Sequence, residues 1–237
     1  MSDKAASKTQ SAHEGHRERL KQRCLDEGLD NFCDHQVLEL LLFYALPYQD
    51  TNELAHRLLD TFGSFSGVLN ADYSELLRVQ GVGRHTAALL AFMPDLLRRY
   101  QMDQFGPRPN LRNLSLAGEY CCAMFLGHSY ESFYMLCLDQ QGNLNRAALI
   151  GEGTINNVPV YPRIAVETAL RHRAAGVILA HNHPGGSPQP SREDIVLTEK
   201  ITQALATINV PVLDHLIVAG GQYISLGQKG LIKGSLL

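Results

Sequence analysis

The spacing of apolar residues changes near the middle of this chain. Before the polar stretch QMDQFGPRPNLRN, leucines recur at the i, i+3, i+4 spacing of amphipathic helices, as in Asp34–Leu46 and Thr51–Phe62. After it, segments typical of strands alternate with segments typical of helices. The stretch itself holds two prolines and no apolar period, which is typical of a linker. We therefore predict an all-α domain over residues 16–101, a linker over residues 102–113 and an α/β domain over residues 114–237.

The second domain is predicted in more detail from its individual segments. Strands are expected at residues 131–139, 145–153 and 177–181, and as a pair within residues 210–226 around Gly220-Gly221. Helices are expected at residues 115–126, 162–174 and 192–208. Such interleaving predicts an α/β sandwich whose sheet carries helices on both sides.

Composition limits the kind of protein that this chain can be. Residues 1–15 are polar and aperiodic, which predicts a disordered arm without a secretory signal. The longest apolar runs fall well short of the roughly 20 residues that span a bilayer, so we expect no membrane association. The five cysteines are odd in number and lack CxxC spacing, which favours reduced thiols in a cytoplasmic protein. A net charge of −3 gives no overall basic field for nucleic acid.

The stretch HNHPGGSPQPSRED, residues 181–194, carries the clearest chemical pattern. His181 and His183 end an apolar strand and point to the same face of it, because side chains alternate along a strand. Zinc favours imidazole ligands, and catalytic zinc sites use three protein ligands, so Asp194 is the nearest candidate for the third. Ser191 and Asp194 also fit a capping box at the start of a helix, and this alternative stays open.

These residues reproduce the pattern H-x-H-P-x(6)-S-x-x-D, which resembles the signature of JAMM (MPN or JAB) metalloproteases. The loop, with LDHLIV downstream, looks like the bacterial RadC branch of that family, and the likeness runs from about His16 to the C-terminus. The resemblance implies a cytidine deaminase-like α/β sandwich, a Zn²⁺ held by His181, His183 and Asp194, and Ser191 as a hydrogen-bond donor to an oxyanion. It also implies a catalytic glutamate at the start of an early strand. Glu131 occupies that place, and Glu152 is the rival.

The resulting hypothesis is a zinc-dependent metallohydrolase that cleaves amide or isopeptide bonds of a protein or peptide. A carboxylate near the metal can accept a proton from water and return it to the leaving amine. Two other hypotheses stay open. The chain can be a DNA-binding accessory protein whose metal site is structural or vestigial, or a phosphodiesterase, which would usually require a second metal ion.

The helical half contains LLRVQGVGRHTAALLAF, which resembles the helix-hairpin-helix motif. In that motif a turn such as Gly81-Val82-Gly83 presents backbone N–H groups and a helix N-terminus to a DNA phosphate, and Arg84 would add charge. RadC-like proteins carry such a domain and were historically labelled DNA repair proteins. The alternative is a hairpin that serves packing alone.

Three residues near the histidine loop are given lesser roles by the sequence. Asn182 points away from the metal and is expected to order the loop rather than to take part in catalysis. Asp214 and His215 begin a predicted edge strand, with His215 bonded to backbone. At most, we expect this pair to orient the metal ligands.

Overall fold

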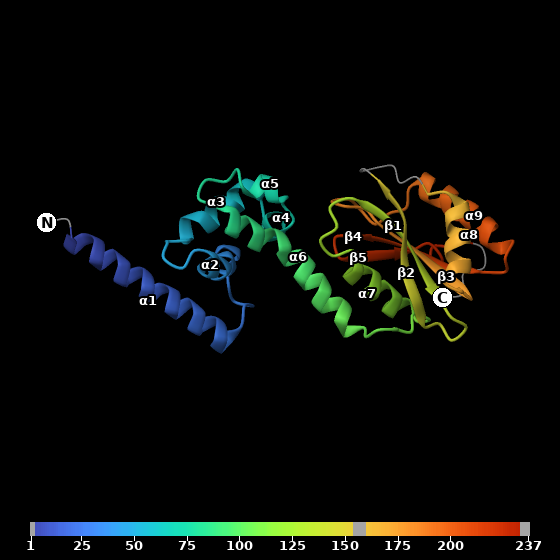
Figure 1. Ribbon diagram of the computed structural model, residues 1–237, viewed down its shortest axis with the longest axis horizontal. Coiled ribbons are helices and arrows are strands. Elements are labelled where there is room, and N and C mark those ends of the chain that lie inside the picture. The colour runs from blue at the N-terminus through green and yellow to red at the C-terminus, as the bar shows by residue number, and fades with distance from the viewer. Residues whose placement is uncertain (1–2, 154–159, 233–237) are drawn as a thin grey trace. The chain divides into compact units, whose positions relative to one another are not determined.

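The computed structural model describes residues 3–153 and 160–232, with the backbone alone in residues 3–14 (Figure 1). The chain forms two compact units, Met1–Pro94 and Asp95–Leu237. No helix among the described residues is long and apolar enough to cross a membrane.

The first unit is entirely helical, as predicted. Its elements are α1 (Asp3–Glu27), α2 (Asp34–Ala45), α3 (Asn52–Phe62), α4 (Phe65–Leu69), α5 (Tyr73–Leu76) and the beginning of α6 (Arg84–Gln104). The predicted leucine faces of α2 and α3 meet in its core, where Leu38, Leu42 and Leu58 are fully buried. Helix α4 was not predicted from the sequence, because it is only five residues long and shows no full period. Ser64 caps it by accepting a hydrogen bond from the N–H of Gly67.

Helix α1 differs from the predicted disordered arm, because it is helical from Asp3 onward. The segment between Asp3 and Gly15 contains no proline and several alanines, so it can continue a helix that tertiary contacts stabilise farther along. Among the described side chains, His16 and Arg17 make such contacts. His16 lies 3.3 Å from the buried carboxylate of Glu39, and Arg17 donates hydrogen bonds to the carbonyl oxygens of Leu46 and Pro47.

The division between the units falls inside α6, whereas the sequence predicted a linker over residues 102–113. The end of α6 belongs to the second unit because Met102 and Phe105 pack against its core. The segment that follows is also bonded to that unit. Leu111 donates its N–H to Gly142 O, and Arg108 bonds the carboxylate of Asp139. The prolines of this stretch thus lie in an anchored connection rather than in a free linker.

The second unit contains a five-stranded mixed sheet. Its strands are β1 (Glu131–Leu138), β2 (Leu144–Gly153), β3 (Gly176–Asn182), β4 (Val212–Ala219) and β5 (Gln222–Ser225), in the order β2-β1-β3-β4-β5. Only β3 and β4 are parallel. Strand β3 is buried along its whole length at the centre of the sheet, as its continuous apolar run predicts.

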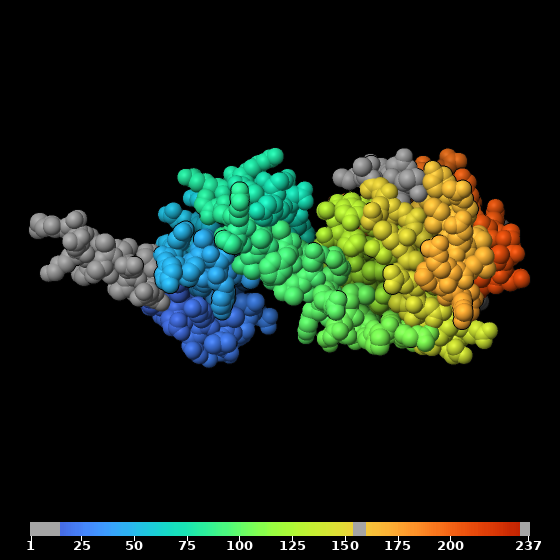
Figure 2. All heavy atoms as spheres, viewed as in Figure 1, coloured from blue at the N-terminus to red at the C-terminus, as the bar shows by residue number. Residues whose placement is uncertain are grey.

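Helices cover both faces of this sheet, as the sequence predicts (Figure 1). Helix α7 (Leu114–Met124) packs on one face, where Tyr120 and Cys121 meet Leu136 and Ile178. Helices α8 (Pro162–Arg171) and α9 (Arg192–Ala206) pack on the other face. Figure 2 shows α8, in light orange, against the yellow strand segment, consistent with its contacts to β2. The face under α8 and α9 is also the face on which His181 lies.

Candidate metal centre

The two histidines lie at the C-terminal end of β3. His181 is buried, and its ring stacks on Phe133, the residue of β1 that pairs with it. His183 is half-buried and points to the same side, so its Nε2 lies 2.9 Å from Nε2 of His181. A tight turn follows, in which Gly185 adopts a φ of 66°, a conformation that glycine accepts without strain. The chain then returns along residues 186–190 to the start of α9.

Asp194 lies in the first turn of α9 and faces both histidines. Its Oδ1 is 3.2 Å from Nε2 of His181, and its Oδ2 is 3.5 Å from Nε2 of His183. Around a tetrahedral zinc with bonds of 2.0 to 2.2 Å, neighbouring ligand atoms are separated by about 3.3 to 3.6 Å. The three side chains therefore offer the donor set of a zinc site, and their separations of 2.9 to 3.5 Å lie at or slightly below this spacing. Within the described part of the chain, no other His, Cys, Asp or Glu joins this group.

The capping box at Ser191 is also formed, and it is compatible with the ligand geometry. Ser191 accepts a hydrogen bond from the N–H of Asp194 at 3.1 Å. In return, Oδ2 of Asp194 accepts hydrogen bonds from the backbone N–H and the hydroxyl of Ser191, at 2.8 and 2.7 Å. Oδ1 of Asp194 takes no part in the box and faces His181. The two interpretations of Ser-x-x-Asp thus describe one arrangement, in which the cap orients the carboxylate.

Asp194 and the histidines beside it affect one another's pKa values. Burial raises the pKa of Asp194, but hydrogen bonds from His181 and His183 lower it by more, so this pKa lies well below its ordinary value. The hydrogen bond to Asp194 raises the pKa of His183, against the opposing effect of burial. Asp194 is thus an anion that stabilises positive charge beside it, as a ligand of a divalent cation must do.

Glu131 and Glu152, the two candidates for the catalytic glutamate, lie on different faces of the sheet. Phe133 pairs with His181, and Glu131 lies two residues earlier, so its side chain lies on the histidine face. Glu131 also contributes to the raised pKa of His183. Glu152 pairs instead with Ser132, which places its side chain on the opposite face. The geometry therefore favours Glu131 over Glu152.

Asn182 has a more definite role than the sequence suggested. Its side chain is buried on the face opposite to the histidines, where its Oδ1 accepts a hydrogen bond from Ser132 N at 2.8 Å and its Nδ2 donates one to Tyr130 O at 3.0 Å. These two backbone groups flank Glu131. The residue between the two histidines thus holds the backbone on both sides of the candidate catalytic glutamate.

His215 and Asp214 are fully buried, and β4 is not an edge strand, contrary to the sequence-based interpretation. Nε2 of His215 lies 2.8 Å from Nδ1 of His181, so its partner is the candidate ligand itself rather than backbone. Asp214 accepts hydrogen bonds from Gly227 N and from the hydroxyl of Ser225, which tie β4 to the residues around β5. A buried position for His215 could not be read from the sequence, because the pairing order of the strands was unknown.

The turn before α6 has the shape that the sequence predicted. Gly81 adopts a φ of 94°, Val82 is buried, and Gly83 and Arg84 are exposed where α6 begins. A Cβ at Gly81 would approach Leu54 to 3.3 Å, so packing alone also favours glycine there. Residues 1–94 carry nine Lys and Arg against thirteen Asp and Glu, so this half of the chain has no net positive charge to attract DNA.

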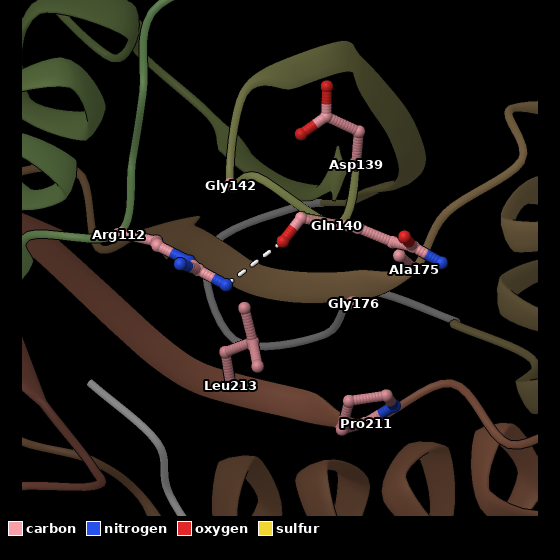
Figure 3. A pocket seen from close by; sticks show the side chains of 8 residues that line it. All are labelled: Arg112, Asp139, Gln140, Gly142, Ala175, Gly176, Pro211 and Leu213. Carbon is pink, nitrogen blue, oxygen red and sulfur yellow. Dashed lines mark hydrogen bonds between the residues drawn. The ribbon is translucent and has the colours of Figure 1, made fainter.

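A cavity of about 430 Å³ lies at the opposite end of the sheet from the histidines (Figure 3). Its wall is formed by Gly176, Pro211 and Leu213, which lie near the starts of β3 and β4, and by the turn between β1 and β2. Its one cationic side chain, Arg112, donates a hydrogen bond to Gln140 O within the cavity wall. The cavity is therefore separate from the candidate metal centre.

This chain is similar to known proteins over its α/β unit and over most of its length. A family model described as the RadC-like JAB domain matches residues 111–231, which include the whole sheet and every residue of the candidate centre. The chain is also 38% identical to a UPF0758 protein of Rhodobacter capsulatus over 213 residues, which is 90% of this chain and the full length of that protein. This chain belongs to the RadC family. The JAB domain of that family begins within the anchored connection after α6 and ends beyond β5.

Membership in the RadC family accounts for the fold of the α/β unit. The fold of a JAB domain is associated with metal-dependent hydrolases, and the His-His-Asp group described above has the composition of a zinc site. The helical residues before position 111 lie outside the matched domain, although the Rhodobacter relative is similar over most of the chain.

Proposed function

We propose that this RadC-family protein is a zinc-dependent metallohydrolase that cleaves an amide or isopeptide bond in a protein or peptide. The observation that carries the proposal is the convergence of His181, His183 and Asp194, with ligand atoms 2.9 to 3.5 Å apart. Three protein donors leave the fourth position of a tetrahedral zinc for an exchangeable ligand, which is the composition of catalytic rather than structural zinc sites.

A zinc ion held by His181, His183 and Asp194 would supply a Lewis acid, which polarises a carbonyl and lowers the pKa of water. The protein supplies the proton transfers. Glu131 lies on the histidine face, where its carboxylate accepts a proton from the attacking water and returns it to the leaving amine. The hydroxyl of Ser191 donates a hydrogen bond to the carboxylate of Asp194. If this hydroxyl turned toward the substrate, its hydrogen bond would stabilise the developing oxyanion.

The alternative of a DNA-binding accessory protein receives less support from the structure and the charge of the helical unit. The turn at Gly81-Val82-Gly83 is formed, but the unit that carries it has a net negative charge. DNA contact through Arg84 therefore remains a prediction made from the sequence alone. A phosphodiesterase would usually need a second metal ion, and the described residues offer one group of metal ligands.

The function is tested by comparing cleavage products in cells that contain either the native protein or the Glu131→Gln variant. Newly formed peptide termini and released isopeptide-linked chains are identified by mass spectrometry. We expect a set of cleavages that is present with the native protein and lost with Glu131→Gln, while both proteins retain zinc. Glu152→Gln is the matched control, because Glu152 lies on the other face of the sheet. Identical product sets for native protein and Glu131→Gln would contradict the proposal.

A further inference from the structure

The nitrogen of His181 that points away from the candidate zinc position has an unusual partner. Nδ1 of His181 lies 2.8 Å from Nε2 of His215, a residue of the neighbouring strand β4. Both side chains are buried, and their rings pack against Phe133. The same nitrogen of His183 instead faces a backbone carbonyl, that of Ser187, at 2.9 Å. A backbone carbonyl therefore fixes the ring of His183, whereas the side chain of His215 holds the ring of His181.

The direction of the hydrogen bonds beyond His215 follows from the atoms involved. Nδ1 of His215 lies 2.6 Å from the hydroxyl of Thr198, and this hydroxyl lies 2.6 Å from the backbone carbonyl oxygen of Asp194. A carbonyl oxygen can only accept, so the single hydroxyl proton of Thr198 is donated to Asp194. Nδ1 of His215 must then carry a proton and donate it to Thr198.

This direction also determines the proton on His181. A charged imidazolium would be costly at the fully buried position of His215, so its ring is neutral and carries one proton, on Nδ1. Its Nε2 then has a lone pair and accepts a hydrogen bond from Nδ1–H of His181. When the ring of His181 is neutral, its one proton is therefore on Nδ1. The lone pair of Nε2, the atom that faces His183 and Asp194, is then available to a metal ion.

We propose that His215 and Thr198 are positioning residues that hold His181 in its metal-binding tautomer. The proposal rests on the metal centre of the proposed function. The hydrogen-bonded chain starts at one candidate ligand, His181 on β3, and ends on the backbone of another, Asp194 on α9. It therefore also ties together the two elements that must approach each other to bind one ion. Neither positioning residue belongs to the His-His-Asp group.

A packing role alone would give a different outcome when His215 is replaced. A phenylalanine of similar shape would fill the space beside Phe133 and leave zinc affinity unchanged. In the proposed role, His215→Phe removes the acceptor for Nδ1–H of His181, so both tautomers become populated. The loss of such a partner behind a metal-ligating histidine typically weakens metal affinity 10- to 100-fold.

The experiment uses the full chain in four variants. His215→Phe and Thr198→Val break the hydrogen-bonded chain, whereas His215→Gln and Thr198→Ser are conservative partners that retain an acceptor or a hydroxyl. In zinc-free protein labelled with ¹⁵N-histidine, long-range ¹H–¹⁵N correlation spectra report the tautomer of His181. Zinc dissociation constants come from competition with a chelator, and circular dichroism checks that each variant is folded.

We expect the Nδ1–H tautomer of His181 in the native protein, His215→Gln and Thr198→Ser. A tautomer mixture with zinc binding about 10- to 100-fold weaker is expected in His215→Phe and Thr198→Val. An Nε2–H tautomer in the native protein would overturn the proposal, as would unchanged zinc affinity in folded Thr198→Val. If native protein bound no zinc, the proposed function would fail, while the tautomer spectrum of zinc-free protein would still decide whether His215 orients His181.

Discussion

Asn182 accepts a hydrogen bond from the backbone N–H of Ser132, 50 residues earlier in the chain, at 2.8 Å. Together with its bond to Tyr130 O, this contact holds β1 against β3 on both sides of Glu131. The same short segment of β3 thus places two candidate metal ligands on one face and fixes the candidate catalytic glutamate from the other.

Replacing Asn182 by Ala should destabilise the protein and impair hydrolysis without removing zinc. The variant leaves the buried N–H of Ser132 without its partner, and an unpaired buried donor typically costs about 1 to 3 kcal/mol. Denaturant unfolding measures the stability, and zinc content is measured on the same sample. Asn110→Ala is the control, since Asn110 also bonds two groups through its amide but is exposed to water. Equal stability losses in the two variants would argue against the special role of Asn182.

Ser191 can be tested by separating its capping role from its catalytic role. Ser191→Asn keeps a good N-cap but removes the hydroxyl, whereas Ser191→Ala removes both and should cost about 1 kcal/mol of stability. If the hydroxyl stabilises an oxyanion, both variants should lower turnover of a substrate found by the product comparison, by about 100- to 1,000-fold. Near-native turnover by Ser191→Asn would restrict Ser191 to capping the helix.

Cys137 gives a prediction for the pH dependence of stability. Burial raises the pKa of its thiol from 9.0 to about 11 in the folded protein. The folded state therefore holds the thiol proton more tightly than the unfolded state, and this contribution to stability is fully present below pH 9 and lost as the pH rises through about 11. Unfolding free energies should fall more steeply over this interval in native protein than in Cys137→Ala. Parallel curves would show that the thiol is not protected in the fold.

DNA contact by the helical unit is tested best at Arg84. Substitution of Gly81 would distort the turn itself because of its positive φ, whereas Arg84 is exposed and can be changed without strain. Arg84→Glu should weaken binding of duplex DNA at low salt, and the salt dependence should become shallower. Arg171→Glu makes the same change of charge on α8, in the other unit, and should have little effect. Equal binding by both variants, or no binding by native protein, would favour a turn that serves packing alone.

The sequence predicted the two kinds of fold and most elements of the sheet domain. Residues such as Val177–Ala180 form a continuous apolar run, and a run of this kind has few alternatives to a central strand. The extent of α1 could not be predicted, because its early residues have no apolar period, and such a segment is helical only when contacts farther along the chain stabilise the helix. The bonded state of the connection before Asn113 could not be predicted either, because its partners Asp139 and Gly142 lie about 30 residues away in the sequence.

At the candidate centre, the local pattern predicted the histidines and Asp194, and the alternation of side chains along a strand predicted that both histidines point to one face. The roles of Asn182, Thr198 and His215 depend on which strands and helices are neighbours, and this is tertiary information. Sequence could show only that Asn182 faces away from the histidines. Its contact with Ser132 requires the pairing of β1 with β3, which the sequence does not specify.

Zinc content measured on purified full-length protein tests the central claim most directly. The protein is saturated with zinc, freed of excess metal by gel filtration and analysed by mass spectrometry of the element. We predict about one zinc per chain in the native protein and in the control His172→Ala, and almost none after joint replacement of His181 and His183 by Ala. Zinc retained at the native level by the folded double variant would contradict the assignment of these histidines as ligands.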